Sequence, residues 1–194
     1  MRAINIIPDN ELSSMTKRSL PFRDLFNRHP GVTLGPSESY SEAASVCLDR
    51  HHISPADFTI ERGNSTLQTI AERETPSERI RRSWANETDR TTNGAYGLAL
   101  AAIEISDNLV AIGRAENGTG ADYYLGPANG SLEDFEQCFR LEVSGVDHGG
   151  TNTLNNRLRQ KKEQALAGKS NLPAIAAVVG FLATQILIAD VELK

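Results

Sequence analysis

The spacing of apolar and polar positions along the chain changes its period near residue 107. In the segment that leads up to this point, residues 95–105 are apolar nearly all round, which predicts a buried helix. After it, short apolar runs bounded by glycine, proline and asparagine indicate buried strands. The pattern predicts helices at about 41–50, from 75 to an interruption at Asn93-Gly94, at 95–105 and at 151–167, and strands at 57–61, 66–70, 109–113, 121–126, 139–145, 174–181 and 186–193.

The ends of several elements carry their own signals. Thr75-Pro76-Ser77-Glu78 combines a capping threonine, a proline suited to the first helical position and a glutamate three residues after the cap. Arg62-Gly63-Asn64 is a turn between two strand-like runs, which predicts a hairpin. Gly168 ends the helix predicted at 151–167.

The second half of the chain runs helix, three strands, helix, two strands. An α/β sandwich with a mixed sheet explains this order best, because hairpins join early strands while a helix crosses over to the next strand. We therefore expect an α/β core over residues 75–194. Residues 1–74 are expected to form a small N-terminal α+β appendage of short helices and one hairpin.

Composition places the chain among ordinary globular proteins, with 194 residues, 39% apolar and 23% charged. Cys47 and Cys138 are too few and too far apart for a disulfide framework, so we predict buried, reduced thiols. Cys47 and His51 share a helical face, but a zinc site needs four ligands and no second pair has ligand spacing. The apolar runs are too short for a membrane span or a signal segment. We expect a cytoplasmic protein without a membrane partner.

Two acids stand on successive predicted strands, in Gly120-Ala121-Asp122-Tyr123 and in Leu141-Glu142-Val143-Ser144-Gly145, before a helix rich in glutamine and lysine. With this order of elements, the chain from about 91 to 190 resembles the PD-(D/E)xK nuclease-like superfamily. The resemblance implies a three-layer, restriction-endonuclease-like α/β sandwich. It also implies that Asp122 and Glu142 hold a divalent metal, Mg²⁺ or Mn²⁺, and that Glu104 is the helix acid of the site.

The chain departs from that family where a lysine belongs two residues after the glutamate. Ser144 stands there, and a serine can hold a water but supplies no positive charge. Lys161 and Lys162 flank the inner stripe of the following helix, so either can reach over the sheet toward Glu142. Two further basic residues of that helix, Arg157 and Arg159, are candidate contacts to nucleic acid phosphates.

Each candidate has a structural alternative. Asp122 is also explained as an exposed strand residue, and Glu104 as a solvent-facing or structural acid. Glu142 is also explained by an ion pair with Arg114 or Arg140. The basic run over residues 157–162 is also explained as a solvated helix face.

Two functions therefore stay open. The resemblance implies a magnesium-dependent nuclease acting on DNA or RNA, or a degenerate relative of one. The alternative is a non-catalytic binding or assembly subunit that uses the fold to contact a protein partner, a second copy of itself or nucleic acid. Ser144, a net charge of −5 and an N-terminal region without a chemical motif favour the alternative, since phosphate binding depends mainly on Lys and Arg.

Overall fold

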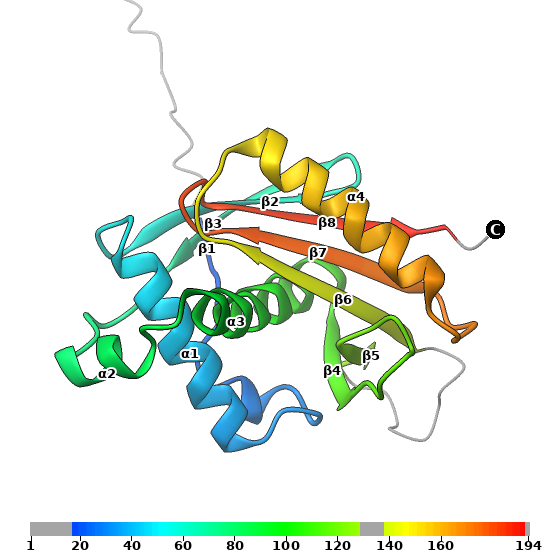
Figure 1. The fold of residues 1–194 in the computed structure, drawn as a ribbon, viewed down its shortest axis with the longest axis horizontal. Coiled ribbons are helices and arrows are strands. Elements are labelled where there is room, and N and C mark those ends of the chain that lie inside the picture. The colour runs from blue at the N-terminus through cyan, green and yellow to red at the C-terminus, as the bar shows by residue number, and fades with distance from the viewer. Residues whose placement is uncertain (1–16, 129–137, 193–194) are drawn as a thin grey trace, which may run out of the picture.

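The computed structural model describes residues 17–128 and 138–192, and its centre is one eight-stranded mixed sheet in the order β1-β3-β2-β8-β7-β6-β5-β4 (Figure 1). The strands are β1 (Arg18–Ser19), β2 (Ala56–Arg62), β3 (Ser65–Ala71), β4 (Leu109–Arg114), β5 (Tyr123–Pro127), β6 (Phe139–Val146), β7 (Ala174–Gly180) and β8 (Gln185–Val191). The helices are η1 (Leu25–Asn27), α1 (Leu34–Asp49), α2 (Glu78–Ser83), α3 (Glu87–Asp107) and α4 (Thr151–Ala167). The α/β class and the mixed sheet predicted from the sequence are confirmed.

The presence or absence of a helix between consecutive strands explains their directions in the C-terminal half of the sheet. β4, β5 and β6 are antiparallel neighbours, whereas β6 and β7 are parallel because α4 carries the chain back between them. β7 and β8 are again antiparallel. The three strands predicted before α4 and the two after it are confirmed.

The predicted hairpin of the N-terminal region belongs to this same sheet. β2 and β3 pair along their whole length, and β2 lies parallel to β8 with Ile60 opposite Ile186. α1 packs against α3, so Ala44 and Cys47 share one apolar core with Ala95 and Leu98. Residues 17–74 are thus continuous with the core in both sheet and helix packing.

Two helix boundaries differ from those predicted. The helical segment is interrupted after α2, at residues 84–86, and not at Asn93-Gly94, which lies inside α3. A Cβ on Gly94 would stand 3.0 Å from the backbone of Ala44, so this glycine serves the close approach of α1 and α3. α1 begins at Leu34, several residues before the predicted start, with Pro36 in its first turn where proline is tolerated.

Helices lie on opposite faces of the sheet, with α4 on one side and α3 on the other (Figure 1). Along β6, Leu141 and Val143 join the main apolar core beneath α3, while Val146 packs with Leu154 of α4. Strand alternation therefore turns Glu142 toward the α4 side, as the sequence predicts. Within the described residues, no helix has the length and apolar character needed to cross a membrane.

Candidate functional site

A cavity of about 900 Å³ lies between the N-terminal half of α3, the β4–β5 connection, the end of β6 and one face of α4. Among the residues predicted for the site, those that line it are Asp122, Glu142, Ser144, Arg157 and Lys161. These residues come from segments far apart in the sequence, and the parallel β6–α4–β7 crossover brings α4 over the strand that carries Glu142.

The face of α4 decides which of the two lysines reaches the sheet. Thr153, Arg157, Lys161 and Gln164 follow one another at helical spacing and all line the cavity. Lys161 Nζ donates to Glu142 Oε1 at 2.6 Å and to Gln164 Oε1 at 3.1 Å. Lys162 lies about 100° farther round the helix and does not line the cavity. Of the two lysines proposed to stand in for the missing one, the structure brings Lys161 to the acids.

Asp122 is fixed by three contacts immediately before β5. Its backbone N–H donates to Leu141 O at 2.7 Å, which ties it to β6. Its carboxylate accepts from the Tyr96 hydroxyl at 2.6 Å through Oδ1 and from the Val143 N–H at 2.8 Å through Oδ2. The alternative of a freely exposed strand residue is therefore wrong, since Asp122 is half-buried and held from two sides.

Glu142 is a carboxylate 3% exposed in the middle of a core strand. Burial raises its pKa, the hydrogen bond from Lys161 opposes that rise, and the nearby charge of Asp122 raises the pKa further. The alternative partners do not contact it: Arg140 instead donates to the carbonyls of Leu172, Thr119 and Ala165. The cavity thus brings Asp122 and Glu142 close enough to interact and pairs Glu142 with Lys161.

The donor chemistry of this pair fits a hard divalent cation. Mg²⁺ and Mn²⁺ prefer carboxylate oxygens, and Asp122 and Glu142 supply them from a rigid sheet. Lys161 pairs with Glu142, whereas the direct donors to the Asp122 carboxylate are neutral groups, the Tyr96 hydroxyl and the Val143 N–H. Ser144 lines the same cavity two residues after Glu142, on the same face of β6, where its hydroxyl can hold a water.

Glu104 lies elsewhere, and the expectation that it joins the site is corrected. It forms an ion pair with Arg28 at 2.8 Å and accepts a hydrogen bond from Nε2 of buried His29 at 3.1 Å, while Nδ1 of that ring accepts from the Ala111 N–H. The part of α3 that lines the cavity ends at Tyr96, and eight further residues carry Glu104 about 12 Å along the helix. The alternative that Glu104 is a structural acid is confirmed. Arg159, likewise, is exposed on α4 and does not line the cavity.

The contacts of Glu104 with Arg28 and His29 predict a pH-dependent contribution to stability. Burial opposes ionisation of Glu104, but the hydrogen bonds from His29 and Arg28 lower its pKa overall. A lowered carboxyl pKa stabilises the fold above the unfolded value of about 4.3, and that contribution is lost as the pH falls through the folded pKa. Glu104→Gln should therefore lower the free energy of unfolding by about 2 kcal/mol at pH 7 and progressively less toward about pH 3.

Urea unfolding of both proteins across this pH range measures the difference. Glu72→Gln is the matched control, because Glu72 is exposed and should change stability by less than about 0.5 kcal/mol throughout. A deficit of Glu104→Gln that stays constant with pH would contradict the assignment.

Tyr96 and Arg114 line the cavity, although the sequence predicts neither as a residue of the site. The sequence predicts Tyr96 only as part of a buried helix, yet its hydroxyl donates to Asp122. Burial raises its pKa, and the adjacent Asp122 charge raises it further, so Tyr96 stays a neutral hydrogen-bond donor. A tyrosine within an otherwise aliphatic helix was the available signal, because a buried phenol usually has a polar partner.

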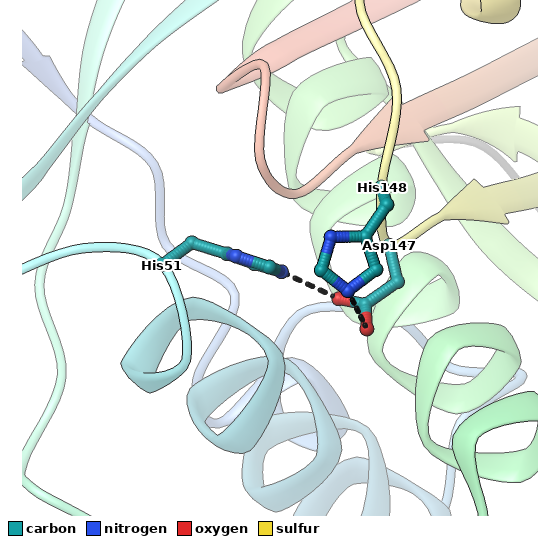
Figure 2. A group of neighbouring side chains, drawn as sticks. All are labelled: His51, Asp147 and His148. Atoms are coloured by element: carbon teal, nitrogen blue, oxygen red, sulfur yellow. Dashed lines mark hydrogen bonds and ion pairs between the residues drawn. The ribbon is translucent and has the colours of Figure 1, made fainter.

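A second polar cluster joins the end of β6 to α1 and α3 (Figure 2). His51 Nε2 lies 2.8 Å from Asp147 Oδ1, and the rings of His51 and His148 both face the Asp147 carboxylate. The other oxygen, Oδ2, lies 3.6 Å from His148 Nε2, 3.4 Å from Arg90 and 3.5 Å from Arg50. Asp147 is 5% exposed, and these contacts connect the end of β6 with the end of α1 and with α3.

The ligand atoms of His51, Asp147 and His148 lie within 4.8 Å of one another, and their types are those that zinc takes. The guanidinium groups of Arg50 and Arg90, however, already compensate the carboxylate that would attract a cation. Burial opposes ionisation of Asp147, but the hydrogen bond and charge of His51 and the charges of Arg50 and Arg90 lower its pKa overall. We interpret the cluster as a structural one, in which Asp147 holds β6, α1 and α3 together.

Cys47 lies against the Asp147 cluster, with Asp147 and Arg90 among its neighbours. Cys47 and Cys138 are both buried, as predicted. Burial, aided by the Asp147 charge, raises the pKa of Cys47 to about 12, so its thiol stays protonated and unreactive.

Comparison with known proteins found no family model, no curated protein and no solved structure that matches this chain.

Proposed function

We propose that this chain is a divalent-metal-dependent nucleic-acid phosphodiesterase of the PD-(D/E)xK type. The observation that carries the proposal is the 2.6 Å contact between Lys161 Nζ and Glu142 Oε1 in the cavity that Asp122 lines. This contact supplies from α4 the positive charge that Ser144 cannot provide on β6.

The arrangement of elements supports the same family. In the order α3, β4, β5, β6, α4, β7, Asp122 lies immediately before β5 and Glu142 lies on the neighbouring β6, with α4 covering the face to which Glu142 points. With α3 and α1 on the other face, we propose a three-layer, restriction-endonuclease-like sandwich (Figure 1).

Each residue of the cavity then has a definable task. Asp122 and Glu142 would hold Mg²⁺ or Mn²⁺, which when bound polarises a phosphoryl oxygen and lowers the pKa of water. Tyr96 and the Val143 N–H keep the Asp122 carboxylate in one orientation, so little reorganisation accompanies binding. Lys161 places an ammonium group beside Glu142, where it can hold a water and stabilise negative charge that develops on the phosphate.

A second candidate, a non-catalytic binding subunit, is supported by a different observation. Both oxygens of Asp122 already accept hydrogen bonds, and Glu142 already has the Lys161 ammonium as its partner. The pair is therefore stable without a cation. This candidate predicts that Mg²⁺ leaves the melting temperature unchanged and that the protein captures a partner without cleaving nucleic acid.

The experiment that separates the two incubates the full chain with single- and double-stranded DNA and RNA, with Mg²⁺, with Mn²⁺ or with a chelator. We expect cleavage of at least one substrate with Mg²⁺ or Mn²⁺ and none with the chelator, because the reaction needs a Lewis acid at the two carboxylates. Melting curves recorded with the same cations should show stabilisation, since an ion that binds the folded state alone raises its stability.

Asp122→Asn is the companion variant, because it keeps the size and an acceptor for Tyr96 while removing the charge. It should lose both cleavage and stabilisation by Mg²⁺. If none of the substrates is cleaved and the cations do not shift the melting curve of the wild-type protein, the enzyme proposal fails and the binding subunit remains.

A further inference from the structure

Arg114, the last residue of β4, stands in the cavity beside the proposed metal ligands. Its guanidinium carbon lies 4.5 Å from the centre of the Tyr96 ring and 4.6 Å from that of Tyr123. Tyr123 is opposite Arg114 in the β4–β5 ladder, and its hydroxyl is bound to that of Tyr40 at 2.5 Å. Two fixed rings thus orient a guanidinium group by cation–π contact.

This charge has no carboxylate partner. Lys161 is paired with Glu142 and Arg90 with Asp147, but Arg114 has no carboxylate within ion-pair distance among the described residues. It donates to the Tyr96 hydroxyl at 3.1 Å, and the Tyr123 hydroxyl is a further hydrogen-bond neighbour. A guanidinium has five N–H donors, so most of the donors of Arg114 remain for a ligand.

The donors of Arg114 lie close to the proposed metal site. The Tyr96 hydroxyl accepts from Arg114 and donates to Asp122, so both side chains contact one oxygen atom. On the opposite wall, Arg157 of α4 also lines the cavity and also lacks a carboxylate partner within the described residues. An anion between the two walls would meet two arginines that have no other counter-ion.

We propose that Arg114 binds a phosphate group in this cavity, with Arg157 as the second contact. The planar fork of arginine matches phosphate oxygens in a bidentate way, and such charge-assisted bonds are stronger than neutral ones. The proposal deepens the proposed function, since it names the residue that holds the phosphodiester next to Asp122. The ligand class is a phosphate mono- or diester anion.

Binding measured in a chelator tests this without any cleavage. A short labelled DNA duplex and a single strand are titrated with wild type, Arg114→Gln and Arg114→Lys over a range of KCl concentrations. Arg114→Gln should bind about tenfold or more weakly, and the slope of log K against log salt should become less negative by about 0.9 for the duplex or about 0.7 for the single strand. Arg114→Lys should recover the slope but only part of the affinity, because it keeps the charge and loses the fork.

Arg79→Gln is the matched control, because Arg79 is exposed on α2 and does not line the cavity; it should bind as wild type does. Inorganic phosphate in a thermal-shift series forms the second arm: stabilisation by phosphate that Arg114→Gln abolishes, without nucleic acid binding, assigns the site to a free phosphate ester. If Arg114→Gln matches wild type in both arms, the proposal is overturned. If Arg114 is required for binding but Mg²⁺ supports no cleavage, this site stands and the nuclease proposal falls.

Discussion

Glu142→Gln is expected to reduce metal-dependent cleavage about a thousandfold while leaving the fold at least as stable as wild type. The loss follows from the role of a metal ligand, since transition-state charge stabilisation by a bound cation is worth several kcal/mol and each ~1.4 kcal/mol changes a rate tenfold. The stability follows from burial, because Glu142 is a buried carboxylate whose charge is opposed by desolvation and by Asp122. Glutamine keeps the shape and an acceptor for Lys161 while it removes that charge.

The opposite signs of the two effects separate function from structure. A glutamate present only for its ion pair with Lys161 would destabilise the protein when replaced, whereas a ligand held at an electrostatic cost would not. Cleavage rates under single-turnover conditions and urea unfolding of the same preparations give both quantities. A fall in stability of more than about 1 kcal/mol with unchanged cleavage would reassign Glu142 to a structural role.

Neighbouring lysines on α4 provide a matched pair for the same experiment. Lys161→Met should lose most of the cleavage rate, because it removes the ammonium group bound to Glu142. Lys162→Met deletes the same charge one residue later, from a side chain that does not line the cavity, and should cleave as wild type does. Equal losses in both variants would mean that net charge on α4, rather than the position of Lys161, supports activity.

Strand alternation is the reason that the site on β6 could be predicted from the sequence. Period-two patterning places Glu142 and Ser144 on one face and Leu141 and Val143 on the other, and the structure has them so. Helical spacing on 151–167 limited the replacement lysine to two residues. The choice between them required the crossing of α4 over β6, which no local pattern encodes.

Long-range contacts explain what the sequence did not predict. Glu104 follows an apolar helix face, but its partners Arg28 and His29 lie about 75 residues earlier, in a region with little periodicity. Tyr96 and Arg114 meet because β4 returns antiparallel beside β5 and under α3. Gly94 resembled a helix break because glycine lowers helix propensity, yet packing against Ala44 overrides that cost.

Asp147 offers the largest expected effect on stability. Asp147→Ala should lower the free energy of unfolding by about 3–5 kcal/mol, because it leaves the Arg90 guanidinium, 4% exposed, without its carboxylate in the core. It also removes the acceptor of His51 and so loosens the junction between β6, α1 and α3 (Figure 2). Urea unfolding followed by circular dichroism measures this change.

Asp57→Ala is the matched control, since it also removes an aspartate from an ion pair, but Asp57 and Lys17 are both exposed. Such pairs contribute about 0–1 kcal/mol, so this variant should unfold nearly as wild type does. Adding Arg90→Met to Asp147→Ala should recover part of the lost stability, because the second substitution takes away the uncompensated buried charge. If Arg90→Met instead adds its own full cost to that of Asp147→Ala, the two side chains are not coupled and Asp147 stabilises the fold through His51 and Arg50 alone.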